Sequence, residues 1–320
     1  MIRFKFTIFT LLMLFSNFLH ASASKGSLPT PAKIKVLTTT SDLQSLVVEL
    51  GADRVEVKSF TDGRQDPHYI EARPIFMTQV ASSDLIVAIG LELEAGWLPS
   101  VLKGARNSKL MPGSKGYLEV GPHVDKLGVL NYEPGRDQGD VHPDGNPHFL
   151  LDPLQAIKAA KAIKDRLCLH DSGYAKYYED RFSSLKERLE KKTLLWAERI
   201  KKTNIKEIIT YHETLTYFCE RFGLKIRAEF EPKPGVPPTS KHIISLIDEV
   251  KKMQAPLALI ENFYSDIPAK RIKESVPAFQ YELIPVYVRG EKNLNTLDDL
   301  YEHLVQVLER LSLKVLQNKS

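Results

Sequence analysis

The sequence has few cysteines, no marked excess of either charge, and only one long hydrophobic run. Only two cysteines, Cys168 and Cys219, occur in 320 residues, which excludes a framework of several disulfides but leaves one bridge or two free thiols open. The 44 basic and 40 acidic residues give a net charge of +4. Charges of both signs are interleaved, so nucleic acid is not the expected partner. Beyond the amino terminus we find no second long apolar run, and we expect a soluble mature protein.

The hydrophobic run at the amino terminus has the parts of a secretory signal peptide. Arg3 and Lys5 precede the apolar segment FTIFTLLMLF, which leads to the small-residue site Ala21-Ser22-Ala23. A membrane anchor would need about 20 apolar residues, and this run is shorter. We therefore expect residues 1–23 to be a cleaved signal peptide and residues 24–31 a short linker. The mature protein would then be periplasmic, and no cysteine near the cleavage site indicates lipid attachment.

The order of predicted strands and helices indicates two α/β lobes with central, mostly parallel sheets. In the first lobe, residues 32–170, we expect the strands KIKVLTTT, VEVKSF and DLIVAIGL. The last is continuously apolar after Asp84, as in a sheet covered on both faces. Residues 171–203 should form one long connecting helix, because apolar positions that include Leu194 and Leu195 recur at roughly helical spacing. The α/β pattern restarts in residues 204–320. A continuous helix of this length would act as a rigid strut between the lobes.

Three histidines lie where predicted strands or loops end. His68 follows the strand VEVKSF, His148 ends a loop over residues 121–147 that is rich in Gly, Pro and Asp, and His212 follows the strand IKEIITY. The carboxyl ends of strands in open α/β sheets face the binding crevice, so these side chains can converge. Neutral imidazoles are good ligands for zinc and neighbouring transition metals. The placement indicates a divalent metal site, although any single histidine is more often an ordinary surface or core residue.

The segments around these histidines resemble the zinc- and manganese-binding periplasmic solute-binding proteins of metal ABC importers. QDPHYIEARP, NPHFLLDP and TYHETLTYFCERFGL are similar to the family's segments around its three ligands, and EPKPGVPPTSKHIISLI and ALIENFYSD resemble segments of its second lobe. The resemblance covers nearly the whole mature chain. It implies two α/β lobes bridged by one long helix, with the metal site in the cleft between them. It also implies a carrier that delivers Zn²⁺ or Mn²⁺ to an inner-membrane ABC permease and its ATPase.

The fourth ligand position departs from the family pattern. Many relatives have an aspartate after the strand near YELIPVYV, whereas this chain has Val288-Arg289-Gly290-Glu291. We expect Glu261, at the end of the strand ALIEN, to take that place, with Glu291 or a water molecule as the alternatives. Glu261 could instead accept a hydrogen bond from the N–H of a ligand imidazole without binding the metal itself. A histidine at the third position favours zinc, because manganese prefers more oxygen ligands.

The loop before His148 holds two further histidines, His123 and His142. His142 is a candidate accessory ligand, but a His-Pro pair in a Gly/Asp loop is more often solvated surface. Since a continuous helix resists bending, we also hypothesise that metal leaves by movement of the loop near residues 139–147 more than by closure of the lobes.

Two other functions compete with a carrier. Three histidines with an open fourth position could activate water in a zinc hydrolase, but the sequence has no HExxH motif, and we expect no enzyme. A metal-binding, adhesin-like surface protein is the other alternative. We expect the carrier to be a monomer.

Overall fold

The computed structural model describes residues 32–132, 135 and 138–317. All described helices and strands belong to one compact unit, Lys33–Ser320. The predicted signal peptide and the linker over residues 24–31 lie outside the described residues. In the part that the structure describes, no helix is both long and apolar enough to cross a membrane.

The first lobe is built on a four-stranded parallel sheet with the order β2-β1-β3-β4. All four residues of β3 are buried, as its continuous apolar run predicts. β4 has no counterpart among the predicted strands, because three residues are too short to show a period. The elements in chain order are β1 (Ile34–Thr38), α1 (Ser41–Gly51), β2 (Val55–Ser59), α2 (Pro74–Ala81), β3 (Leu85–Ala88), α3 (Leu98–Ala105) and β4 (Tyr117–Glu119).

The second lobe repeats this design. Its four strands are again all parallel, in the order β6-β5-β7-β8, and β7 is buried along its whole length. The two parallel-sheet α/β lobes expected from the sequence are therefore confirmed. The elements are β5 (Glu207–Thr210), α6 (Thr216–Phe222), β6 (Lys225–Glu229), α7 (Ser240–Lys252), β7 (Leu257–Glu261), α8 (Ile267–Ser275), β8 (Gln280–Ile284) and α9 (Leu297–Gln317).

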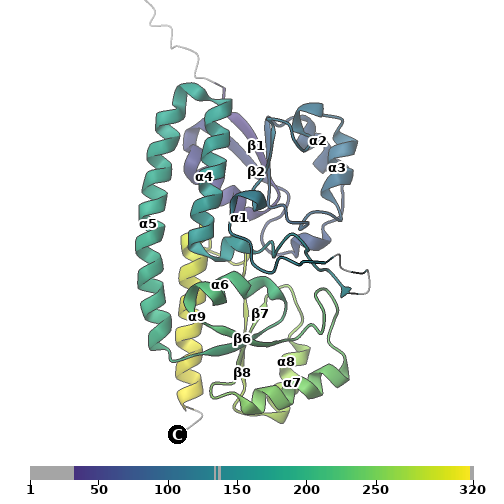
Figure 1. The fold of residues 1–320 in the computed structure, drawn as a ribbon, viewed down its shortest axis with the longest axis vertical. Coiled ribbons are helices and arrows are strands. Elements are labelled where there is room, and N and C mark those ends of the chain that lie inside the picture. The colour runs from purple at the N-terminus through teal and green to yellow at the C-terminus, as the bar shows by residue number, and fades with distance from the viewer. Residues whose placement is uncertain (1–31, 133–134, 136–137, 318–320) are drawn as a thin grey trace, which may run out of the picture. The chain divides into compact units, whose positions relative to one another are not determined.

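One long helix, α5 (Ala175–Lys202), runs alongside elements of both lobes (Figure 1). It packs against α4 (Pro153–His170) and α1 on one side of the junction and against α9 of the second lobe. The buried face includes Leu185, Leu189 and Trp196, at the spacing of an amphipathic helix. Leu194 and Leu195 are exposed, so their assignment to the buried face of the helix is wrong. At this end of α5 the next residue, Trp196, is the buried one, and its ring contacts Tyr301 of α9.

Direct hydrogen bonds also join the two lobes. The hydroxyl of Ser41 donates to the carbonyl of Val288 at 2.6 Å, and the carboxylate of Asp42 accepts the Val288 N–H at 2.6 Å. Next to them the Arg289 guanidinium donates to the side-chain oxygen of Gln44 at 2.7 Å. The start of α1 is thereby fixed to the segment that follows β8, which sets the relative position of the strand ends of both sheets.

The two cysteines are free thiols. Cys168 lies partly buried in α4, and Cys219 is buried in α6, where burial raises its thiol pKa to about 12. A thiol that stays protonated has little reactivity. Both residues therefore belong to helix packing, which resolves the alternative that the sequence left open.

Candidate metal centre

His68 is held by a short turn, Pro67–Tyr69, shortly after β2. Asp66 caps this turn and accepts both the His68 backbone N–H at 3.0 Å and the ring Nδ1–H at 2.6 Å. The indole N–H of Trp97 donates to the Pro67 carbonyl at 2.9 Å, which fixes the turn from the other side. Because Nδ1 is engaged, Nε2 is the atom that His68 presents to the junction between the lobes.

His148 is placed by the end of the long loop. Its backbone N–H donates to the side-chain oxygen of Asn146 at 2.9 Å, and the Asn146 amide donates to the Glu213 carbonyl at 3.0 Å, in the other lobe. The His148 ring Nδ1 lies 3.4 Å from the Tyr287 hydroxyl, and Nε2 has no hydrogen-bond partner. Burial, together with neighbouring histidines, lowers the His148 pKa well below its usual value. The ring is therefore neutral and offers a lone pair.

His212 follows β5, and its ring is oriented by a buried carboxylate. Nδ1 lies 2.8 Å from Oε2 of Glu231, which also accepts the N–H of Gly235 at 2.8 Å. Burial acts to lower the His212 pKa, but the hydrogen bond and the charge of Glu231 prevail and raise it to about 9. Nε2 has no partner. A metal ion that binds there must first displace a proton, as is general for histidine ligands.

The structure brings His68, His148 and His212 together as the sequence predicts. One ring nitrogen of each lies within 4.8 Å of those of the other two, and the three residues are 9%, 5% and 3% exposed. A zinc ion with N–Zn bonds of 2.0–2.1 Å would hold such nitrogens about 3.3 Å apart, so only small adjustments are needed. In all three rings a neighbour approaches Nδ1, which is the arrangement that orients imidazoles toward a metal.

Glu261 ends β7 and is completely buried. Burial raises its pKa to about 7, against the opposing effects of the Thr214 hydroxyl and the charge of His212. Two groups of three donor atoms within 4.8 Å of one another occur among the described residues, and Glu261 belongs to neither. The other carboxylate candidate, Glu291, is half exposed and lies 4.0 Å from His303.

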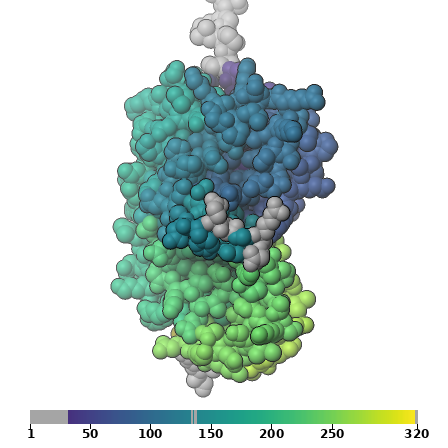
Figure 2. Space-filling model, turned by 45° about the vertical axis from the view of Figure 1, so that its right-hand side comes forward, coloured from purple at the N-terminus to yellow at the C-terminus, as the bar shows by residue number. Residues whose placement is uncertain are grey.

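The interpretation of His142 as solvated surface is wrong. His142 is only 4% exposed, and its Nε2 lies 3.1 Å from Nε2 of His68. The loop folds back on itself through hydrogen bonds from Leu130 N–H to Pro143 and from Gly145 N–H to His142. Figure 2 shows the teal chain of this loop at the boundary between the blue first lobe and the green second lobe. The composition of the loop could not predict that His142 is buried, because this burial depends on the contact with His68, 74 positions earlier in the sequence.

Asp66, Glu231 and Asp140 are site residues that sequence reasoning missed. Asp140 places one carboxylate oxygen 3.9 Å from Nε2 of His68. The signal for Asp66 was present, because it lies two residues before His68 in a turn that begins with proline. Glu231 gave no such signal, since it approaches His212 from another segment of the chain. Asp140 lies two residues before His142 in the loop, but its approach to His68 comes from a distant part of the sequence.

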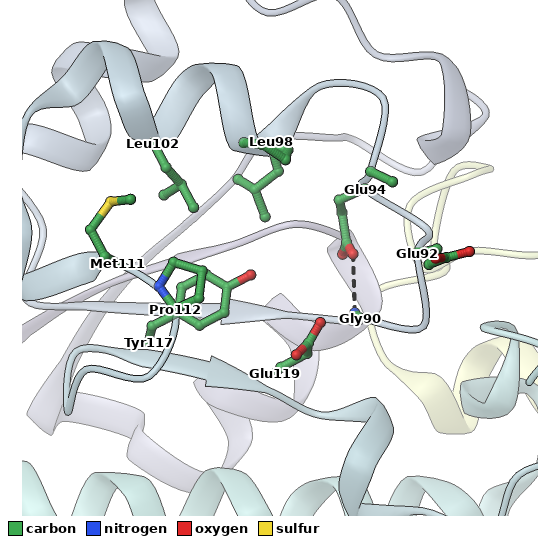
Figure 3. A pocket seen from close by; sticks show the side chains of 11 residues that line it. Gly90, Glu92, Glu94, Leu98, Leu102, Met111, Pro112, Tyr117 and Glu119 are labelled. Atoms are coloured by element: carbon green, nitrogen blue, oxygen red, sulfur yellow. Dashed lines mark hydrogen bonds between the residues drawn. The ribbon is translucent and has the colours of Figure 1, made fainter. Parts of the chain in front are cut away.

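A separate pocket of about 320 Å³ lies in the first lobe (Figure 3). None of the clustered histidines lines it. The Glu94 carboxylate accepts the N–H groups of Ile89 and Gly90 at 2.8 and 3.0 Å at its edge, and burial raises the Glu94 pKa to about 7. These bonds brace the segment that leads to Trp97, and through it the turn that carries His68.

Comparison with known proteins agrees with the fold and places the chain in a family. The family model "Zinc-uptake complex component A periplasmic" matches residues 36–311. The manganese ABC transporter substrate-binding lipoprotein PsaA of Streptococcus pneumoniae is 24% identical, with 88% of each chain covered. The metal ABC transporter substrate-binding lipoprotein FimA of Streptococcus parasanguinis is 26% identical, with 91% of this chain and 94% of that protein covered.

Solved structures share the two-lobed architecture. A crystal structure of ZnuA superposes with a TM-score of 0.71 at 18% identity and covers 88% of this chain and 99% of its own. A cadmium-bound periplasmic metal binding protein from Candidatus Liberibacter asiaticus gives a TM-score of 0.71 at 21% identity, with 87% and 100% covered. At this identity the structures establish the fold alone. The family model spans most of the chain, and the protein therefore belongs to the family of periplasmic component A proteins of zinc-uptake complexes.

Proposed function

We propose that this protein captures one divalent transition metal ion, zinc in preference to manganese, through Nε2 of His68, His148 and His212. The observation that carries the proposal is the convergence of three buried imidazoles whose donor nitrogens lie within 4.8 Å of one another. Two of those Nε2 atoms, on His148 and His212, have no hydrogen-bond partner. A buried polar atom without a partner costs free energy, and a bound metal ion would remove that cost.

The donor set supports zinc as the preferred cargo. Three imidazoles suit zinc, whereas manganese favours sites with more oxygen ligands. Glu261 stays our candidate for the fourth position, because a fully buried carboxyl group close to His212 would be stabilised as a carboxylate by a nearby cation. A water molecule is the alternative, in which case Glu261 would support the site from behind.

Family membership makes the chain a substrate-binding protein of a metal ABC importer and not an enzyme. Such a protein works outside the cytoplasm with a membrane permease and its ATPase. The relatives are named as ABC transporter substrate-binding lipoproteins, so they support neither the hydrolase nor the adhesin-like alternative. For this chain we propose a periplasmic monomer released by cleavage after Ala23.

Zinc binding to the metal-free protein tests the site. With zinc at about 100 times its Kd, the free energy of unfolding should rise by about 2.7 kcal/mol. His68→Ala, His148→Ala and His212→Ala should each abolish most of this gain, while His123→Ala, which removes an exposed histidine of the same loop, should leave it intact. If all three variants keep the full gain, the site assignment is wrong.

A second measurement addresses the cargo and the fourth ligand. Competition between zinc and manganese for the same protein should favour zinc, because of the three nitrogen donors. Glu261→Gln keeps the shape of the side chain and removes its charge, so it should weaken zinc binding if Glu261 is a ligand. Equal affinity of this variant and the wild type would leave Glu291 or water as the fourth ligand.

A further inference from the structure

Two carboxylates meet at one glycine at the edge of the pocket in the first lobe (Figure 3). Oε2 of Glu94 accepts the N–H of Gly90 at 3.0 Å. Glu119, the last residue of β4, packs against the same glycine, where a Cβ would lie only 2.3 Å from the Glu119 Cγ. The absence of a side chain at Gly90 therefore lets Glu119 lie next to the Glu94 carboxylate. A third carboxylate, Glu92, also lines the pocket, and no lysine, arginine or histidine is among the described residues that do so.

This end of the pocket carries negative charge that the described residues do not neutralise. Burial raises the Glu94 pKa to about 7, and the charge of Glu119 acts in the same direction. Within the part of the chain that the structure describes, the Glu119 carboxylate has no ion-pair partner. Like charges held close together in a partly buried site disfavour each other. A bound cation would remove that cost.

The hydroxyl of Tyr117 faces the same two carboxylates. Tyr117 is only 9% exposed, and among the described residues its hydroxyl has no hydrogen-bond partner. Burial raises the Tyr117 pKa, and the charges of Glu94 and Glu119 add to this effect. Figure 3 shows the ring directed from β4 toward the two carboxylates. A polar group of a largely buried side chain normally has a partner, so this hydroxyl also points to a ligand.

The opposite wall of the pocket is apolar. Leu98 and Leu102 lie one turn apart on α3, and both are buried. Met111 and Pro112, from the segment between α3 and β4, complete this wall (Figure 3). The volume of about 320 Å³ is near the lower end of the range for small-molecule sites, about 300–1,000 Å³. The pocket therefore combines an apolar wall with an acidic end, on a scale that suits a small ligand.

We propose that this pocket binds a small organic cation, namely a primary alkylammonium ion. Its N–H groups would donate to Glu94, Glu119 and the Tyr117 hydroxyl, and its alkyl chain would lie against Leu98 and Leu102. A bare metal ion fits less well, because no group of three metal ligands within 4.8 Å of one another among the described residues includes Glu94 or Glu119. The site shares no residue with the three-histidine centre, so it adds a second class of ligand to the proposed capture of metal.

Titration of the full protein with hexylammonium, followed by calorimetry at neutral pH, tests the proposal. 1-Hexanol has the same chain without the charge, and it should bind at least about 10-fold more weakly. Butylammonium lacks two methylene groups and should bind about 10- to 15-fold more weakly than hexylammonium, since each buried methylene contributes about fourfold in affinity. Glu119→Gln should raise the Kd of hexylammonium by about 10-fold or more, and Tyr117→Phe by about 2- to 10-fold.

Two further variants serve as controls. Glu56→Gln removes an exposed carboxylate of β2, the edge strand on the other side of the sheet from β4, and should leave the Kd of hexylammonium unchanged. His212→Ala removes a ligand of the proposed metal site and should also keep the wild-type Kd for hexylammonium. Loss of zinc binding is thereby distinguished from loss of amine binding. Thermal melts verify that each variant is folded.

Three results would overturn the proposal. The first is the absence of detectable binding at about 10 mM hexylammonium. The second is equal affinity for hexylammonium and 1-hexanol, which would make the pocket an apolar cavity without a role for its carboxylates. The third is a wild-type Kd for hexylammonium in both folded Glu119→Gln and folded Tyr117→Phe, which would place the amine elsewhere on the protein.

Discussion

Replacement of Asp66 by asparagine should weaken zinc binding while the fold and the position of His68 are kept. Asp66 accepts the ring Nδ1–H of His68 at 2.6 Å and its backbone N–H at 3.0 Å. Burial acts to raise the Asp66 pKa, but these bonds and the Tyr264 hydroxyl hold it below its ordinary value, so the group is a carboxylate. Asparagine has the same shape, yet it lacks the charge that strengthens the imidazole as a ligand and fixes its tautomer.

The expected loss is about 10- to 100-fold in zinc affinity, or about 1.4–2.7 kcal/mol. With zinc at about 100 times the wild-type Kd, bound metal should stabilise the wild type by about 2.7 kcal/mol and the variant by only about 0.4–1.4 kcal/mol. A competition titration against a chromophoric chelator measures Kd. Urea unfolding with and without zinc measures the stabilisation independently.

Two companion variants separate charge from packing. Asp62→Asn removes an exposed carboxylate of the same segment that pairs with Arg64, and it should leave Kd within about twofold, since such surface pairs contribute little. Tyr264→Phe removes a hydroxyl that donates to Asp66 at 3.0 Å but leaves the bond to His68. The reasoning is refuted if folded Asp66→Asn binds zinc as tightly as the wild type, or if Asp62→Asn loses as much affinity.

Two further predictions concern stability. Burial raises the Asp42 pKa to about 7, although the hydrogen bond from the Val288 N–H acts to lower it. Between about pH 4 and 7 the folded state then keeps a proton that the unfolded state has lost. This group therefore lowers the free energy of unfolding increasingly as pH rises through that range. At pH 8, urea unfolding should therefore give Asp42→Asn a free energy of unfolding up to a few kcal/mol above that of the wild type. This difference should shrink toward pH 4. A difference in free energy that does not vary with pH contradicts the prediction. Leu189→Ala, on the buried face of α5, should lower the free energy of unfolding by about 2–5 kcal/mol, while the folded variant still binds one zinc ion at 25 °C. A loss below about 1 kcal/mol would show that Leu189 does not make the core contact described.

The parts of the fold that the sequence predicted are those determined by local patterns. The run LIVAIGL that follows Asp84 has no polar side chain, as a strand or helix buried on all sides requires, and it includes β3. The segment of α5 has neither proline nor glycine, so a single continuous helix follows from its composition. Which residues of α5 face inward near its end depends on α9, and the sequence of α5 alone could not distinguish Leu195 from Trp196.

The same limit applies to the candidate site. His68, His148 and His212 each follow a strand or precede a helix, and sheet topology alone brings such positions together. His142 belongs to a loop without a period of its own, and its burial depends on contacts with His68 and with the loop's own turns. Glu231 follows β6, which neighbours β5 in the sheet, so its place beside His212 required the strand order.

The hydrogen bond from Ser41 to Val288 joins residues 247 positions apart. Contacts of such long range close late, because the entropy of a large loop must be overcome before any contact compensates for it. A folding intermediate with only one structured lobe can present His68 or His212 but not both, and it would hold metal weakly. In the proposed site the three ligands would therefore meet only when both lobes are folded, so a bound ion would mark a chain in which both lobes are complete.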